Sequence, residues 1–203
     1  VTDGAPTALS YASPNVFTKG TGISDLTPTS SGGAVISYSI SPSLPTGLNF
    51  NTATGIISGI PTVVTPITTY TVTATNSGGS TTFGIVITVK DVAPSALSYT
   101  SPNVFTKGTG ISDLTPTSSG GAVVSYSIAP SLPTGLNFNS TTGIISGIPT
   151  AVTPIATYTV TATNSGGSTT FGIVITVKDV APSALSYTSP NVFTKGTTIA
   201  NLN

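Results

Sequence analysis

Apolar and polar residues alternate along much of this chain with a period of two. In residues 69–75, Tyr70, Val72 and Ala74 share one side and threonines occupy the other. Side chains of a β-strand point alternately to opposite faces, so this pattern predicts a strand with one buried face. No stretch of the sequence carries the apolar stripe of a helix. The pattern therefore predicts an all-β protein.

The same alternation of apolar and polar residues predicts further strands. The residues expected to face inward are Phe83, Ile85, Ile87 and Val89 in residues 82–89, and Ile36, Tyr38 and Ile40 in residues 35–40. Shorter strands are expected at residues 8–11, 16–18, 23–27, 48–51 and 55–58. Glycine permits the backbone of tight turns. Residues 76–79 (Asn-Ser-Gly-Gly) are therefore expected to form a hairpin turn, and residues 30–33 (Ser-Ser-Gly-Gly) another turn.

An 88-residue unit occurs twice, at residues 5–92 and 93–180, with differences at eight positions. The differing pairs are Thr7 and Ser95, Ala12 and Thr100, Ile36 and Val124, Ser41 and Ala129, Thr52 and Ser140, Ala53 and Thr141, Val63 and Ala151, and Thr68 and Ala156. Residues 1–4 are expected to be the tail of a preceding repeat, and residues 181–203 the N-terminal part of a third. Repetition at a fixed period indicates an array of identical folding units.

Each unit is expected to fold as an immunoglobulin-like β-sandwich. About seven short strands separated by turn signals at regular spacing are typical of that architecture. The chain has no cysteine and no tryptophan. It therefore lacks the inter-sheet disulfide and the core tryptophan of antibody domains.

One run of residues carries a family resemblance. Residues 44–62 read LPTGLNFNTATGIISGIPT and are followed by YTVTATN at residues 70–76, and the second repeat matches at 132–150 and 158–164. These motifs resemble the family called Putative Immunoglobulin domain, which is close to the cadherin-like domains of bacterial surface proteins. The resemblance implies tandem β-sandwiches on a large secreted or cell-surface protein. It implies no catalytic residues, because the family shares none.

The charged residues are few and balanced. Five lysines face five aspartates for a net charge of zero, and the chain contains no Arg, Glu or His. Nucleic-acid binding and binding to an anionic membrane surface need clustered basic residues, so neither is expected. Apolar runs are too short to cross a bilayer, so no membrane insertion is expected. Low charge with abundant Thr, Ser, Gly and Asn favours an extracellular or cell-surface location, and zero net charge favours association between copies.

Metal binding and catalysis find little support in the sequence. Calcium needs six to eight oxygen ligands, several of them carboxylates, whereas each repeat junction offers a single aspartate, Asp91 or Asp179. These two are expected to be solvated turn residues, and Asp25 and Asp113 turn or capping residues. With no His or Glu and with isolated carboxylates, the protein is not expected to be an enzyme. No catalytic residue, cofactor site or metal site is predicted.

An internal isopeptide bond is a further possibility in extracellular sandwiches. It needs a buried lysine beside an asparagine with a carboxylate nearby. Lys19 and Lys90 lie near strand ends, and residues 80–89 contain no asparagine. Exposed lysines at strand ends are therefore expected.

A row of threonines is the most distinctive surface feature that the sequence predicts. Thr69, Thr71, Thr73 and Thr75 should project from one face of a strand, roughly 6.6–6.8 Å apart. Such a row is a possible contact surface for carbohydrate or ice. The simpler interpretation is that threonine forms strands well and is compatible with a solvated face.

Tyrosines are the other candidates for contact with a sugar ring. Tyr38 and Tyr70 alternate with polar residues on apolar faces, so they are expected in the core. Tyr11 lies close to the junction and is expected to pack against the adjoining domain.

Three functions remain open from the sequence. The first is a structural repeat array, as the stalk of a bacterial adhesin or an extracellular fibre, whose partners are the neighbouring repeats. The second is a filament subunit, in which residues 181–203 would add a strand to a sheet edge of another copy. The third is a module that binds glycans or ice.

Overall fold

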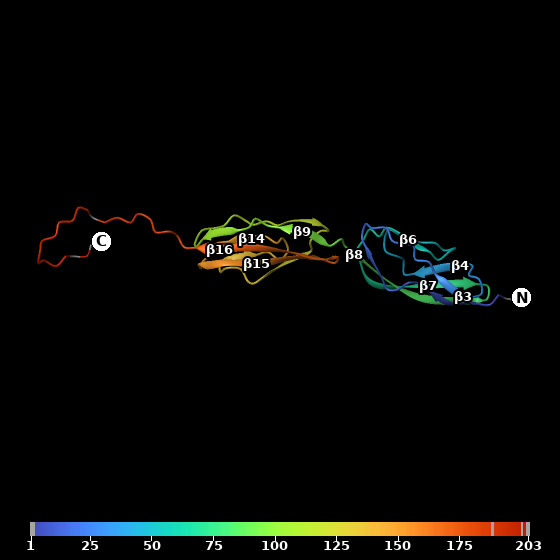
Figure 1. Ribbon diagram of the computed structural model, residues 1–203. Helices are drawn as coiled ribbons and strands as arrows, with labels where there is room; N and C mark the ends of the chain where they lie inside the picture. Colours follow the sequence, from blue (N-terminus) through green and yellow to red (C-terminus); the bar gives the residue numbers. More distant parts are fainter. Residues whose placement is uncertain (1–2, 188, 200, 202–203) are drawn as a thin grey trace.

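The computed structural model describes residues 3–187, 189–199 and 201, and shows two elongated β modules in line (Figure 1). The first module contains β1 to β8 and the second β9 to β16, and an extended segment follows the second. The outermost residues of the predicted segments 1–4 and 181–203, together with residues 188 and 200, lie outside the described residues. No helix occurs in the described part of the chain, and thus none that could cross a membrane.

Eight strands build each module. Those of the first are β1 (Pro6–Ser10), β2 (Asn15–Thr18), β3 (Thr29–Gly32), β4 (Ser37–Ser41), β5 (Leu48–Phe50), β6 (Ile57–Gly59), β7 (Thr65–Asn76) and β8 (Gly79–Lys90). Those of the second are β9 (Pro94–Ser98), β10 (Asn103–Thr106), β11 (Thr117–Gly120), β12 (Ser125–Ala129), β13 (Leu136–Phe138), β14 (Ile145–Gly147), β15 (Thr153–Asn164) and β16 (Gly167–Lys178).

Two layers of sheet face each other in each module. One layer is a four-stranded sheet in the order β2-β8-β7-β4, in which β2 runs parallel to β8 and the other pairs are antiparallel. The other layer contains the pairs β1-β3 and β5-β6, and a bridge between Leu26 and Ile57 extends it. The second module repeats this arrangement with the same strand order. The prediction of tandem immunoglobulin-like sandwiches is confirmed.

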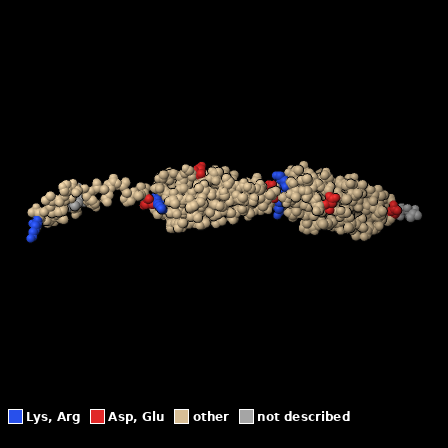
Figure 2. Space-filling view, turned by 45° about the horizontal axis from the view of Figure 1, so that its top comes forward, with Lys and Arg blue, Asp and Glu red and all other residues tan. Residues whose placement is uncertain are grey.

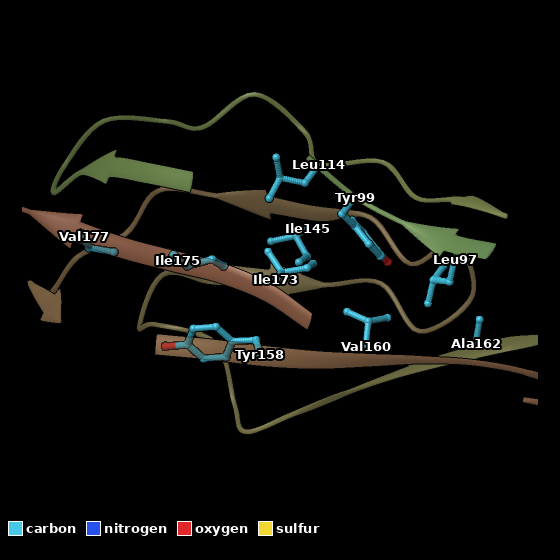
Figure 3. Packing of buried hydrophobic residues seen from close by; sticks show 10 residues of the cluster. All are labelled: Leu97, Tyr99, Leu114, Ile145, Tyr158, Val160, Ala162, Ile173, Ile175 and Val177. Atoms are coloured by element: carbon cyan, nitrogen blue, oxygen red, sulfur yellow. The ribbon is translucent and has the colours of Figure 1, made fainter. Parts of the chain in front are cut away.

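The core lies between the layers and is dominated by the long hairpin β7–β8. Val72, Ala74, Ile85, Ile87 and Val89 have no exposed surface. Figure 3 shows the equivalent core of the second module, with side chains of β15 and β16 packed under Leu97, Tyr99 and the 114–145 bridge. Burial of each of these valines and isoleucines stabilises the fold by roughly 1.5–3 kcal/mol. The alternation in residues 69–75 and 82–89 therefore identified the core strands.

The prediction for Ile36 is wrong. Its side chain is 66% exposed, and Val35 packs against the core instead. The alternation slips by one residue before β4, where the side-chain amide of Asn76 binds the Ala34 carbonyl at 3.1 Å. Tyr38 and Ile40, within β4, are half-buried and pack on the core as predicted.

Two local predictions in the second layer are also wrong. Residues 23–27 form no strand and contribute the Leu26–Ile57 bridge, with a further backbone bond from Ile23 to Gly59. Residues 30–33, expected to be a turn, lie largely in β3, whose four residues are all exposed. A strand without a buried side chain carries no alternating apolar signal, so the pattern could not reveal it.

The turn of the β7–β8 hairpin was predicted correctly. Asn76 and Gly79 are the last paired residues, which leaves a two-residue loop. Pro66 lies within β7, at a register shift between Thr65 and Thr68. Proline cannot donate a ladder hydrogen bond, so an irregularity is where a strand accommodates it.

Candidate functional site

The tyrosines belong to the core. Tyr11 is 6% exposed, its hydroxyl donates a hydrogen bond of 2.7 Å to the Gly55 carbonyl, and its ring lies 6.1 Å from that of Phe83. The expectation that Tyr11 packs against the adjoining domain is therefore wrong, because it is buried within its own module. Tyr70 is buried and Tyr38 half-buried.

The predicted threonine row lies on the outer face of the four-stranded sheet. Thr69, Thr71 and Thr75 are exposed, and Thr73 is half-buried. The strand register adds neighbours that the sequence analysis missed, although the alternating serines of β4 were a visible signal. The cross-strand rows are Ser37, Thr75 and Ser80; Ser39, Thr73 and Thr82; and Ser41, Thr71 and Gly84. We call this set, with Thr69, the hydroxyl face.

The second module carries the same face. The equivalent threonines on β15 are Thr157, Thr159, Thr161 and Thr163. One hydroxyl is lost there, because Ala129 takes the place of Ser41. Lysines gather at module ends and in the C-terminal segment, and one acidic patch lies on the flank of each module in this view (Figure 2). Every member of the hydroxyl face is Ser, Thr or Gly. The hydroxyl face is thus a neutral surface of short polar side chains.

The aspartates at the two junctions differ in their surroundings. The side chain of Asp91 is 23% exposed and lies 3.6 Å from the Lys19 ammonium, whereas Asp179 is 66% exposed and lies 3.9 Å from Lys107. Asp91 is therefore more enclosed than the solvated turn residue that was predicted. Among the described residues, no group of three or more Asp, Glu, His or Cys could hold a metal ion.

A cluster at the start of the second module holds the linker, residues 91–93. The Asp91 amide donates to Ser165 Oγ at 2.9 Å, and Asn164 Nδ2 donates to the Val92 carbonyl at 2.7 Å. Gly121 and Gly166 lie against the same backbone, where a Cβ on either would collide with the carbonyl oxygens of Val92 and Asp91 respectively. We call Gly121, Asn164, Ser165 and Gly166 the clamp.

A buried asparagine organises the clamp. Asn164 is 7% exposed, and its amide also donates to the Ala122 carbonyl at 3.0 Å. Its carbonyl oxygen accepts hydrogen bonds from the amides of Gly166 and Gly167. Asn76 forms the same arrangement around Gly4 at the start of the first module, with an Nδ2–O distance of 2.8 Å. The hairpin turn therefore binds backbone groups of the linker. This explains why the linkers before the two modules can differ in sequence.

Comparison with known families settles the identity of the modules. The family described as "Putative Ig domain" matches residues 5–90 and 92–178. The chain belongs to this family. The boundaries 5–92 and 93–180, and the assignment of residues 1–4 and 181–203 to flanking repeats, stay predictions.

Sequence relatives of the Ig-like modules include a bacterial adhesin. The "Serine-rich adhesin for platelets" of Staphylococcus aureus is 32% identical over 165 residues, which is 78% of this chain and 7% of the adhesin. The protein of the same name from strain MRSA252 is also 32% identical, with 12% of its length covered. The chain thus spans a small fraction of these relatives.

A solved structure shares the Ig fold. Extracellular domains 3–5 of Drosophila OTK match with a TM-score of 0.51 and 15% sequence identity, over 84% of this chain and 62% of that one. At this identity the similarity shows the fold alone.

We expect the buried tyrosines to make the Ig-like modules sensitive to alkali. Burial, with a smaller contribution from Tyr38, raises the pKa of Tyr11 far above its ordinary value of about 10, and Tyr99 behaves in the same way beside Tyr126. In the unfolded chain these tyrosines ionise near pH 10, whereas in the fold they keep the proton. Their contribution to stability is therefore complete below about pH 10 and is lost as the pH rises further.

Urea unfolding at pH 8 and pH 11 of the wild type and the double variant Tyr11→Phe/Tyr99→Phe tests this prediction. At pH 8 each substitution should destabilise its module by about 1 kcal/mol through the lost hydrogen bond. The double variant should lose less stability between the two pH values than the wild type. An equal loss in both proteins would show that the buried tyrosines do not cause the alkaline sensitivity.

Proposed function

We propose that this chain is a spacer segment of a bacterial surface adhesin, in which Ig-like modules add length. One observation carries the proposal: the two modules lie in line, and the chain enters and leaves each at opposite ends (Figure 1). Near-identical modules joined in this way extend a structure by a fixed step per repeat. The role requires no catalysis, and the neighbouring modules are the partners that it requires.

The pairing of β2 with β8 supports a role under tension. Four residue pairs join these strands in parallel, from Asn15–Ile87 to Thr18–Lys90. β2 lies near the start of the module and β8 at its end, so pulling on the chain ends drives the two strands past each other. All four residue pairs then resist the pulling force at the same time, whereas two strands that are peeled apart lose one residue pair after another.

The relation to the staphylococcal adhesin supports an extracellular location. Its name describes adhesion to platelets, and the matched part of this chain corresponds to 7% of its length. A segment of that size fits a repeated portion of a long surface protein. We infer that the present modules hold a binding region of the whole protein away from the cell.

The alternative of a filament built by strand donation finds less support. Both modules already hold their own first strands, with β1 paired to β3 and β2 to β8, and likewise in the second module. A donated strand would have to displace one of these pairs. The spacer needs no such exchange.

Sedimentation and small-angle X-ray scattering of the full chain over a wide concentration range test the spacer role. We expect a monomer whose maximum dimension corresponds to two modules in line and stays constant with concentration. Mass that grows with concentration would favour the filament. A compact monomer with the modules folded against each other would contradict the spacer.

The hydroxyl face suggests a second function, the binding of neutral carbohydrate. Rows of Ser and Thr hydroxyls on adjacent strands offer both donors and acceptors, as sugar hydroxyls require. The face is neutral and recurs in both modules, so one long glycan could contact both. Ice is the other ligand that a regular array of this kind could meet.

Binding to a printed array of neutral glycans, followed by ice-affinity partitioning, tests the second function. The double variant Thr71→Lys/Thr159→Lys should weaken any binding at the hydroxyl face by roughly tenfold or more, since each removes a hydroxyl and adds a bulky charge. Ser31→Lys/Ser119→Lys, on exposed strands of the opposite layer, is the matched control. Absence of wild-type binding, or equal loss in the control, would exclude this function.

A further inference from the structure

The linker belongs structurally to the module that follows it. Its polar backbone groups bond to that module: the Asp91 amide to Ser165, the Val92 carbonyl to Asn164, and the Ala93 carbonyl to the Gly121 amide at 3.3 Å. Because Gly121 and Gly166 of the clamp have no side chain, the linker backbone packs directly against them. Residues 91–93 are therefore expected to move as one body with the second module.

The first module holds the chain up to Lys90. The Lys19 amide donates to the Lys90 carbonyl at 2.8 Å, which continues the β2–β8 pairing to the end of β8. The rigid part of the first module thus ends at Lys90, and that of the second begins at Asp91. The Lys90–Asp91 peptide group joins the two bodies, with its carbonyl bonded to the first module and its amide to the second. Because a peptide group is planar, the bodies can turn relative to each other only about the backbone bonds on either side of it.

An ion pair spans that link. Lys19 Nζ lies 3.6 Å from Asp91 Oδ1. Among the polar side-chain contacts of the described residues, this ion pair joins the first body to the second. The lysine side chain is 44% exposed. Figure 2 shows charged residues gathered where the two modules meet. A pair that is partly open to solvent in this way is weak and is screened by salt.

An apolar cleft lies at the same joint. It has a volume of about 390 Å³, and its lining includes Val64 of the first module and Val124 of the second. Val124 is 69% exposed and Val64 39% exposed. A bend that closes the cleft would remove both valines from water, which favours this direction of bending over others.

We propose that the junction pivots about the backbone bonds on either side of the Lys90–Asp91 peptide group, that the Lys19–Asp91 ion pair latches it, and that it bends toward the Val64–Val124 cleft when the latch opens. The array would then be a jointed rod whose stiffness falls with ionic strength. The pivot adds to the proposed spacer role, and its purpose rests on that role. Whether the pivot exists is tested on the monomer, independently of the spacer role.

Distance measurements between the modules test the pivot. The chain has no cysteine, so spin labels on Ser39→Cys and Ser127→Cys, at equivalent exposed positions of β4 and β12, report on the joint alone. Lys19→Ala is compared in this background with Lys107→Ala. Lys107 makes the same ion pair with Asp179, after which the described residues 181–187, 189–199 and 201 form no strand, and it is therefore a matched control.

We expect Lys19→Ala to raise the population of bent conformers roughly two- to fivefold, the effect of losing one exposed ion pair. High salt should do the same to the wild type, and Lys107→Ala should change nothing. Equal distributions for the wild type and Lys19→Ala, or an equal effect of Lys107→Ala, would overturn the latch. A wild-type distribution that is already broad and insensitive to salt would overturn it as well.

A second pair of variants tests the direction of bending. Val124→Asp places a charge in the cleft and should reduce the bent population of the Lys19→Ala protein. Ile36→Asp alters the equivalent exposed position of the first module, away from the junction, and should have no effect. If Val124→Asp leaves the bent population unchanged, the cleft does not direct the bend. Failure of the spacer role would appear separately, as self-association or compact monomers in scattering.

Discussion

The long hairpin β7–β8 is the element on which the rest of each module depends. Its two 12-residue strands run between the ends of the module, and their inner face supplies most of the residues with no solvent exposure, to which β6 adds Ile57. Its outer face presents the hydroxyls, its turn forms part of the clamp on the preceding linker, and its final residue leads into the next junction. Core, surface and joint are thus consequences of one alternating pattern.

Because the hairpin turn recognises backbone groups of the linker, the start of each module fixes the chain that precedes it. The end of each module provides no comparable grip, since β8 stops at Lys90 and a single, partly exposed ion pair follows. This asymmetry makes the array a series of rigid bodies with one weak point per repeat. It also agrees with the greater exposure of Asp179 than of Asp91, since the described part of the chain after Val180 forms no strand that could cover Asp179.

The sequence predicted those parts of the fold in which side chains bury apolar surface at every second position. Residues 69–75 and 82–89 therefore identified β7 and β8, and the glycines of residues 76–79 their turn. The slip between Ile36 and Tyr38 and the fully exposed β3 escaped prediction. The slip lies beside a hydrogen bond from the distant Asn76 to the Ala34 carbonyl, which no local pattern reveals, and β3 buries no side chain. The hydrogen bonds of Asn164 and Ser165 to the linker and the Lys19–Asp91 pair join residues more than 70 positions apart, and no local pattern reports such contacts.

Native-state hydrogen exchange of the full chain, followed by mass spectrometry of its peptides, tests the central role of the hairpin most directly. Amides of β7–β8 and β15–β16 should exchange last, at a rate set by global unfolding of their module, while those of β1–β3 and β5–β6 exchange earlier through local opening. Protection of the small pairs that outlasts the hairpins would contradict this account.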